Sequence, residues 1–298
     1  MTIAWVFPGQ GSQKIGMADE VLSLPGAQQR FELASNLIGR DLLKVSRGLN
    51  SEVPFPNDLN DTRNTQPAMF VVESLLVDSL RRKGEKPAFV AGHSLGEIVA
   101  LYAADVFDVN TALKLLKSRS ELMASAQAGA MTAVMGFDRK ELDRLIEASK
   151  DVVVANDNSL GQVVLSGAPE ALSELTESLG CKRAIPLNVS GAFHSPFMNE
   201  PAINFEKELD NVQFDDATIP VISNADPKPT RDSLLLKDRL KKQMITGVRW
   251  RETMDVMVES KINEIVEIGP GNVLSGLAKR SLKDVTISRI SNASDLET

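Results

Sequence analysis

The stretch "FVAGHSLGEIVA", residues 89–100, joins a short apolar run directly to a pattern of apolar residues at helical spacing. Between the two lies Gly92-His93-Ser94-Leu95-Gly96, which matches the Gly-x-Ser-x-Gly pattern of a nucleophile elbow. Small residues on both sides of a serine let the chain turn sharply and leave the hydroxyl exposed at the start of a helix, where backbone N–H groups such as that of Leu95 can stabilise an oxyanion. The stretch therefore predicts an α/β protein with Ser94 as nucleophile. A plain turn with a serine helix cap is the alternative.

A serine is a weak nucleophile until a base takes its proton. The chain has two histidines. His93 is poorly placed, because successive side chains in a tight turn point apart, so His194 in "NVSGAFHSPFM" is the predicted base. The group that orients His194 stays open: Asp226 and Glu267, at the ends of predicted strands, are candidates by position, and a neutral carbonyl would serve equally well.

Strand and helix patterns alternate along the rest of the chain, which is typical of the α/β class. Strands are predicted at Ile3–Phe7 and within "IPVISNA" and "INEIVEIG", and the turn "GPGN" precedes a helix in "VLSGLAKR". A polar loop is predicted from Leu49 to Asn64. A long apolar helix follows, with Pro67 in its first turn and Gly84 as its C-terminal cap.

The region from Met131 to Val189 follows the order β-α-β-β-α-β, which predicts a ferredoxin-like domain inserted into a larger one. The expected domains are therefore a core of residues 1–128 and 190–298 and an insert of residues 129–189. Ser94 precedes the insert and His194 follows it. A site built from both would lie in the cleft between the domains, where ligand sites are common.

Bulk composition narrows the function classes. The 298 residues carry a formal net charge of −7 and the isoelectric point is near 5.1, so non-specific nucleic-acid binding is not expected. Basic residues nevertheless cluster at Arg81-Arg82-Lys83, at Lys237 with Arg239, Lys241 and Lys242, and at Lys279-Arg280. A single cysteine, Cys181, excludes an internal disulfide, and with two histidines it argues against a structural zinc site. No apolar window is long enough to span a membrane, so the cytoplasm is the expected location, or an organelle stroma or matrix if a transit peptide has been removed.

The N-terminal turn "FPGQGSQ", residues 7–13, suggests a phosphate loop at first sight. It lacks the Gly-Lys-Ser/Thr ending of a P-loop, and Lys14 occupies a position where the dinucleotide fingerprint requires glycine. Spacing alone therefore favours an ordinary glycine-rich turn.

Seven motifs in chain order resemble the malonyl-CoA:acyl carrier protein transacylases of type II fatty-acid synthesis. They are "FPGQGSQ", "NTQPA", "GHSLGE", "SRSELM", "NSLGQVVLSG", "GAFHSPFM" and "EIGPGNVLSGL", and they run from Phe7 to Leu277. The resemblance implies an α/β-hydrolase-like core with a mainly parallel sheet and an inserted ferredoxin-like domain. It also implies transfer of a malonyl group from malonyl-CoA to the phosphopantetheine thiol of acyl carrier protein, with no bound cofactor or metal.

The same resemblance assigns roles residue by residue. Ser94 is the nucleophile and His194 its base, and the backbone N–H groups of Gln10 and Leu95 form the oxyanion hole. Arg119 pairs with the malonyl carboxylate, which suits a planar guanidinium that offers two parallel hydrogen bonds. The remaining assignments are Gln66 near the acyl group and Gln243 as a support for His194.

Acyl selectivity is expected to favour malonyl over methylmalonyl groups. In related polyketide acyltransferases an aliphatic residue after the serine and Phe before the histidine accompany malonyl specificity, and here these residues are Leu95 and Phe193. Leu160 departs from the proline that is frequent at its position, which leaves only the shape of that loop in doubt.

Three alternatives stay open at this point. They are a serine hydrolase or thioesterase, an acyltransferase of a polyketide pathway, and a non-catalytic module that binds carrier protein. The carrier protein is typically acidic, so one of the basic clusters is expected to dock it.

Overall fold

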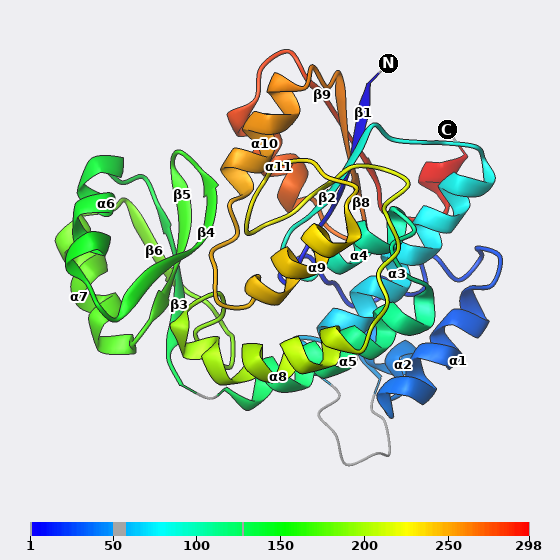
Figure 1. Cartoon of the computed structure of the whole chain (residues 1–298), viewed down its shortest axis with the longest axis horizontal. Coiled ribbons are helices and arrows are strands. Elements are labelled where there is room, and N and C mark those ends of the chain that lie inside the picture. The colour runs from blue at the N-terminus through cyan, green and yellow to red at the C-terminus, as the bar shows by residue number, and fades with distance from the viewer. Residues whose placement is uncertain (1, 50–57, 127, 298) are drawn as a thin grey trace.

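A five-stranded parallel sheet forms the centre of the molecule (Figure 1). The computed structural model describes residues 2–49, 58–126 and 128–297. The strand order is β7-β2-β1-β8-β9, and the strands are β1 (Ile3–Phe7), β2 (Phe89–Gly92), β7 (Val221–Ile222), β8 (Glu264–Ile268) and β9 (Thr286–Ile290). The predicted mostly parallel α/β architecture is therefore confirmed.

Helices cover both faces of this sheet, and the side chains of β1 divide between them with the period of two that a strand dictates. Ala4 and Val6 pack with the helices α10 (Trp250–Glu259) and α11 (Val273–Ser281). Trp5 and Phe7 belong to the larger core on the opposite face. That face carries the helices α1 (Ala27–Ile38), α3 (Thr62–Arg82), α4 (Gly96–Ala103) and α5 (Val109–Ser125).

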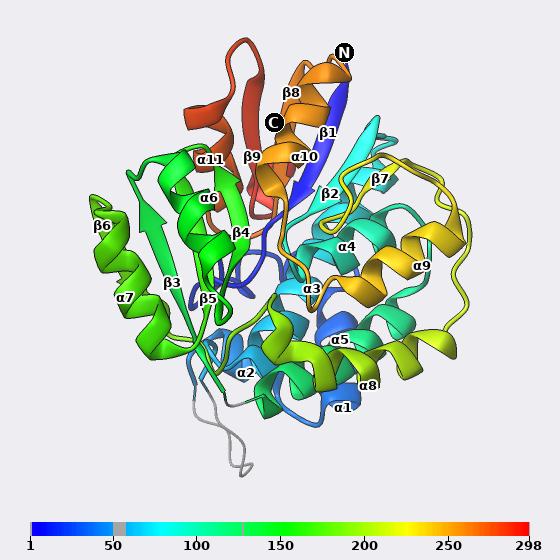
Figure 2. The same cartoon turned by 60° about the vertical axis from the view of Figure 1, so that its left-hand side comes forward.

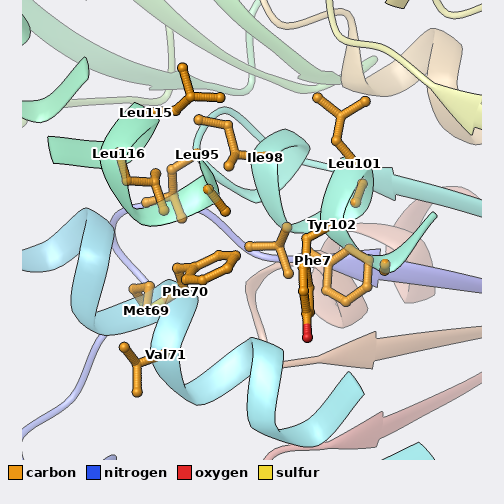
Figure 3. Packing of buried hydrophobic residues seen from close by; sticks show 14 of the residues in the cluster. Phe7, Met69, Phe70, Val71, Leu95, Ile98, Leu101, Tyr102, Leu115 and Leu116 are labelled. Carbon is orange, nitrogen blue, oxygen red and sulfur yellow. The ribbon is translucent and has the colours of Figure 1, made fainter. Parts of the chain in front are cut away.

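The larger core packs tightly around the helix that follows the serine turn. Figure 3 shows Leu95 and Ile98 above the ring of Phe70, while Tyr102 meets Phe70 edge-on at a ring-centroid distance of 5.5 Å. Burial of these side chains anchors α4 and with it the turn that carries Ser94. Further helical segments outside the second sheet are α2 (Leu42–Ser46), η1 (Pro196–Met198), α8 (Asn199–Asp210), α9 (Ser233–Lys242) and η2 (Ser294–Leu296).

A second, four-stranded sheet stands beside α10 and α11 (Figure 2). Its strands are all antiparallel to their neighbours in the order β4-β5-β3-β6, and they are β3 (Ala130–Met135), β4 (Val152–Ser159), β5 (Gln162–Gly167) and β6 (Arg183–Pro186). The helices α6 (Arg139–Ala148) and α7 (Pro169–Leu179) cover its outer face. Met131 and Ala133 point to the opposite face and join the larger core, so this sheet is packed on both sides.

The long apolar helix α3 begins earlier than predicted. Asp61 caps it by accepting a hydrogen bond from the backbone N–H of Arg63, so the helix starts at Thr62 and the predicted first-turn position of Pro67 is wrong. A proline inside a helix leaves the carbonyl four residues earlier without its usual donor. Here that carbonyl, of Arg63, accepts a hydrogen bond from Arg40 Nη1 at 3.2 Å, which offsets the cost.

One strand of the sheet was not predicted, and one predicted loop lies partly outside the described residues. The sheet gains a fifth strand, β9, which was not predicted, because "TISRI" is short and partly exposed at a sheet edge. The predicted loop from Leu49 to Asn64 includes residues 50–57, which lie outside the described residues, and its last three residues belong to α3.

Candidate active site

Ser94 lies at the turn between β2 and α4 in a left-handed conformation, with φ of 55°. The flanking glycines are required by close backbone contacts. A Cβ atom on Gly92 would lie 1.9 Å from the carbonyl of Gly96, and one on Gly96 would lie 2.3 Å from the carbonyl oxygen of Phe7. No side chain fits at these distances, so the sequence forms the sharp strand-turn-helix geometry expected of an elbow.

The N-terminal glycine-rich turn lies against this elbow. A Cβ atom on Gly9 would lie 2.5 Å from the carbonyl oxygen of His93, so glycine allows the two turns to touch. Gln10, next in the chain, lines the same cavity as Ser94 and Leu95. Within the described parts of the chain, the backbone N–H groups of Gln10 and Leu95 have no protein acceptor, which leaves both donors available to a ligand.

His194 lies beside Ser94. Its Nε2 is 2.8 Å from Ser94 Oγ, and its Nδ1 is 2.9 Å from the backbone carbonyl oxygen of Gln243. With Nδ1 donating to that carbonyl, Nε2 is the acceptor of the Ser94 hydroxyl proton. Burial, reinforced by the positive charge of Arg119, lowers the pKa of His194 to about 3. The imidazole is therefore neutral near pH 7, the state that a base requires.

Neither of the two carboxylates considered as orienting groups contacts His194. Asp226 pairs with Arg239 at 2.6 Å. Glu267 accepts hydrogen bonds from the backbone N–H groups of Leu274 and Ser275 at the start of α11. Of the alternatives left open by the sequence, the geometry therefore favours the neutral carbonyl, which belongs to Gln243.

Arg119 extends from α5 to the other side of the serine. Its Nη2 lies 3.2 Å from Ser94 Oγ and 2.9 Å from Gln243 Oε1, and its Nη1 lies 2.7 Å from Gln66 Oε1. The side chain is 1% exposed, and its Nε–H has no hydrogen-bond partner among the described residues. Burial lowers the pKa of Arg119 to about 10, against an opposing effect of the Glu97 charge, so the guanidinium stays protonated near pH 7. A buried cation with an unused donor suits an anionic ligand group.

A small cavity of about 70 Å³ brings the predicted residues together. Its walls come from both sheets and from the segments between them: Gln10, Gln66, His93, Ser94, Leu95, Arg119, Met123, Met131, Asn156, Leu187, Val189, Phe193 and His194. Gln243 does not line it but holds Arg119 and His194 from behind. A second cavity of about 680 Å³ is lined by Ser159 at the end of β4, the strand that also carries Asn156, and by Arg251 and Arg280.

Sequence reasoning missed three buried polar residues of the site. Asn224, at the end of β7, accepts a hydrogen bond from the Ser94 backbone N–H at 2.8 Å, and Glu97 receives the backbone N–H of Asn224 at 3.1 Å. Asn158 Oδ1 lies 2.9 Å from His93 Nε2, which turns His93 away from a basic role. Glu97 and Asn158 stood inside recognised motifs, whereas Asn224 carried no local signal.

The described residues offer neither a metal site nor a membrane-spanning helix. Among residues 2–49, 58–126 and 128–297, no group of three or more histidine, cysteine, aspartate or glutamate side chains is arranged to hold a metal ion. In the same residues, no helix has the length and apolar character that crossing a membrane requires.

Comparison with known proteins first gives the class. A family model described as "Acyl transferase domain" matches residues 4–296, almost the whole chain. The chain therefore belongs to the acyltransferase class.

Individual relatives narrow the class. The malonyl CoA-acyl carrier protein transacylase of Synechocystis sp. (strain ATCC 27184 / PCC 6803 / Kazusa) is 45% identical over 298 residues, covering all of both chains. Its crystal structure matches with a TM-score of 0.94 over 100% of this chain and 99% of that one. The polyketide biosynthesis malonyl CoA-acyl carrier protein transacylase PksC of Bacillus subtilis (strain 168) is 39% identical over 95% of this chain and 98% of its own.

A further match is a type II polyketide synthase acyl-carrier protein in complex with its malonyl-transacylase. It has a TM-score of 0.92 and 34% identity, over 100% of this chain and 98% of that one. The chain belongs to the malonyl-CoA:acyl carrier protein transacylase family.

Proposed function

We propose that this protein transfers a malonyl group from malonyl-CoA to the phosphopantetheine thiol of an acyl carrier protein through a malonyl-Ser94 ester. The observation that carries the proposal is the position of Ser94 Oγ, 2.8 Å from His194 Nε2 and 3.2 Å from Arg119 Nη2. A nucleophile that lies between a neutral base and a buried guanidinium is placed to attack a thioester whose acyl group ends in a carboxylate.

The first half of the reaction forms the ester. His194 Nε2 takes the proton of Ser94 as Oγ attacks the thioester carbonyl, and the N–H groups of Gln10 and Leu95 donate to the oxyanion that forms. The carbon–sulfur bond then breaks, coenzyme A leaves with the proton from His194, and malonyl-Ser94 remains. In the second half the carrier-protein thiol gives its proton to His194 and attacks the ester. Ser94 recovers its proton as malonyl-carrier protein leaves.

Acyl selectivity follows from Arg119 and from the size of the cavity. The amide oxygens of Gln66 and Gln243 hold the guanidinium in place, and the unpartnered Nε–H of Arg119 supplies a further donor for the malonyl carboxylate. An acetyl group would leave this buried cation unpaired, which is costly. Phe193 is 5% exposed at the cavity wall and leaves little room for an added methyl group, so malonyl is preferred over methylmalonyl.

The inferred domain division follows the two sheets. Residues 129–189 form a ferredoxin-like insert and residues 1–128 with 190–298 form an α/β-hydrolase-like core. The order β4-β5-β3-β6 with helices on one face, and the parallel sheet with a serine turn after β2, support this division. Expression of residues 129–189 alone, followed by thermal unfolding, tests whether the insert folds by itself.

The three basic clusters differ as docking sites for an acidic carrier protein. Two of them are engaged in internal contacts: Arg81 pairs with Asp105, Lys83 reaches the carbonyl of Leu296, and the cluster on α9 pairs with acidic side chains of α8, α9 and the segment after β7. Lys279 and Arg280 are exposed, and Arg280 lines the larger cavity with Arg251. We therefore place carrier-protein docking at Lys279 and Arg280.

The docking proposal is tested by charge reversal. A Lys279→Glu/Arg280→Glu variant is expected to slow transfer to carrier protein and to leave transfer to free pantetheine unchanged. The matched variant Lys241→Glu/Lys242→Glu should affect neither acceptor. Equal slowing of both acceptors by the first variant would count against docking at this site.

Mass spectrometry of the intact protein tests the main proposal. Malonyl-CoA should add one malonyl group to the wild type and none to a Ser94→Ala variant, with less label from acetyl- and methylmalonyl-CoA. A malonyl group on the Ser94→Ala variant would overturn the assignment of Ser94 as the nucleophile. Release of malonate to water as fast as transfer to a thiol would instead favour the hydrolase, and a wild type that takes no label would favour a non-catalytic binding module.

The preferred carrier protein tests whether the protein serves fatty-acid or polyketide synthesis. Relatives with fatty-acid and with polyketide names both match over nearly the whole chain. We propose fatty-acid synthesis as the main role, which predicts faster transfer to the fatty-acid carrier protein of the source organism than to any polyketide carrier protein it encodes.

A further inference from the structure

A buried carboxylate, Glu97, lies in the first turn of α4, three residues after Ser94. It is 1% exposed and does not line the cavity that holds Ser94 and His194. Its Oε2 accepts two hydrogen bonds, from Gln243 Nε2 at 2.7 Å and from the backbone N–H of Asn224 at 3.1 Å. Each donor leads to a different part of the site.

The Asn224 branch leads to the nucleophile. Asn224 Oδ1 accepts the backbone N–H of Ser94 at 2.8 Å, and Asn224 Nδ2 donates to the carbonyl of Gly92 at 2.6 Å. The side-chain amide thus bridges the two sides of the turn that holds Ser94 in its left-handed conformation. Such a conformation is unfavourable for a residue with a side chain and persists only where the surroundings fix it.

The Gln243 branch leads to the base and to the guanidinium. Gln243 Nε2 also donates to the carbonyl of Ser94 at 2.9 Å, its Oε1 accepts from Arg119 Nη2 at 2.9 Å, and its backbone carbonyl accepts from His194 Nδ1 at 2.9 Å. A glutamine amide has a donor end and an acceptor end that can exchange places by rotation. Because a carboxylate can only accept and a guanidinium can only donate, Glu97 and Arg119 together fix which end faces which.

We propose that Glu97 is a positioning residue that orients Gln243 and Asn224, and through them Arg119, His194 and Ser94. In a serine triad a carboxylate bonds the histidine directly. Here the carboxylate of Glu97 acts indirectly, through its hydrogen bonds with Gln243 and Asn224. The inference rests on the proposed roles of Ser94, His194 and Arg119.

The charge environment of Glu97 fits this role. Burial raises the pKa of Glu97 and outweighs the opposing hydrogen bonding from Gln243, Asn224 and Ser223 and the nearby charge of Arg119. Three of these four opposing contributions come from residues that the carboxylate is proposed to hold. An ionised Glu97 also offsets the buried charge of Arg119 when no malonyl carboxylate is bound.

The test compares Glu97→Gln with Glu73→Gln. Glu73 is a matched control, because it is also fully buried, lies on α3, and has no hydrogen-bond partner for either carboxyl oxygen among the described residues. Glu97→Gln removes the negative charge and leaves one acceptor oxygen, so the two charged hydrogen bonds from Gln243 and Asn224 become neutral ones at best. This weakening is expected to lower kcat/KM for malonyl-CoA about 10- to 100-fold.

Selectivity separates a positioning role from a structural one. A misoriented Gln243 releases Arg119, so Glu97→Gln should lose discrimination between malonyl- and acetyl-CoA as well as rate. Glu73→Gln should keep the wild-type ratio of the two substrates whatever its effect on unfolding temperature. A wild-type ratio in Glu97→Gln, with a reduced unfolding temperature, would mean that Glu97 only supports the fold.

Coupling to Gln243 gives a second measurement. If Glu97 acts through the amide, Glu97→Gln and Gln243→Met should affect the malonyl-to-acetyl ratio less than additively when combined. If Glu97→Gln does not fold, Glu97→Asp keeps the carboxylate but shortens it by one methylene, and the same loss of selectivity is expected. An unchanged ratio in folded Glu97→Asp, or strict additivity, would overturn the proposal.

Failure of this inference is distinguishable from failure of the proposed function. If the wild type forms no malonyl ester at Ser94, the proposed function is wrong. If it does, and Glu97→Gln is labelled at the wild-type rate with the wild-type selectivity, only the positioning role of Glu97 is wrong.

Discussion

The two walls of the site cavity differ in kind. The wall on the parallel-sheet side carries Ser94, His194 and Arg119, each buried or half-buried and each hydrogen-bonded to another group of the site. The wall on the side of the small sheet offers Met131 and Asn156, an apolar and an amide side chain. The proposed reacting and charged groups therefore belong to the larger core: Ser94 follows the carboxyl end of β2, Arg119 extends from α5 and His194 precedes η1. The small sheet delimits the space.

The largest expected effect is on the free energy of unfolding. It compares Gly92, in the turn that carries Ser94, with Gly161, in a hairpin of the small sheet. Gly92→Ala places a Cβ atom 1.9 Å from the backbone of Gly96, so we expect destabilisation of about 4 kcal/mol or more. Gly161, in the hairpin between β4 and β5, has nothing within 4 Å of a Cβ atom, and Gly161→Ala should stay within about 0.5 kcal/mol of wild type. Urea unfolding measures both. Similar losses in the two variants would contradict a serine turn that has no room for a Cβ atom and a β4–β5 hairpin that has room for one.

Loss of the buried guanidinium should have the next largest effect. Arg119→Leu removes the proposed partner of the malonyl carboxylate, and we expect kcat/KM for malonyl-CoA to fall about 10- to 100-fold, the range for a charged hydrogen bond, with a much smaller change for acetyl-CoA. Arg139→Leu, which breaks the ion pair with Asp157 at the small sheet, should leave the substrate ratio unchanged. Steady-state kinetics with both thioesters decide. Equal losses for malonyl and acetyl groups in Arg119→Leu would remove its role in selectivity.

The pH dependence of the rate tests whether the imidazole of His194 is neutral. A histidine with its ordinary pKa would lose its basic form below pH 6.5, whereas the pKa of His194, lowered to about 3 by burial and by Arg119, keeps it neutral. The rate of ester formation should change less than about twofold between pH 7 and pH 5. Removing the nearby cation in Arg119→Leu should raise the pKa of His194 and move the acid limb of the pH–rate profile to higher pH. An acid limb near pH 6.5 in the wild type would contradict the buried neutral imidazole.

The same shift has a consequence for stability. The unfolded chain binds a proton at His194 below pH 6.5 and the folded protein does not do so until about pH 3. Stability should therefore fall as the pH drops through that interval, and His194→Gln should weaken the dependence. Urea unfolding at pH 7 and at pH 4.5 measures it.

The smallest effect is expected at the small sheet. Asn158→Ala removes the hydrogen bond to Nε2 of His93, which lines the cavity but has no proposed part in proton transfer. Loss of one neutral hydrogen bond predicts a rate decrease of about three- to tenfold with unchanged substrate selectivity. A loss as large as that of Arg119→Leu would show that the small sheet contributes to the chemistry and would remove the contrast.

Local sequence signals predicted much of the fold and the turn that carries Ser94. The Gly-x-Ser-x-Gly pattern is local in sequence, but only Gly92 is required by a contact inside the turn, whereas Gly96 is required by the carbonyl oxygen of Phe7 on β1. The start of α3 was misplaced, because the cap at Asp61 and the long-range donor Arg40 together tolerate Pro67 in the interior. Strand β9 was missed since a short edge strand buries little surface and shows a weak pattern.

The sequence by itself determined the α/β class, the turn that presents Ser94, and the choice of His194, because these depend on local sterics and on a count of two histidines. Only the tertiary structure decided what surrounds them. It brought the carbonyl of Gln243 to His194, separated Asp226 and Glu267 from it, and connected Glu97 to both Gln243 and Asn224. These contacts join residues up to 146 positions apart, and hydrogen bonds over such separations depend on packing that no local pattern encodes.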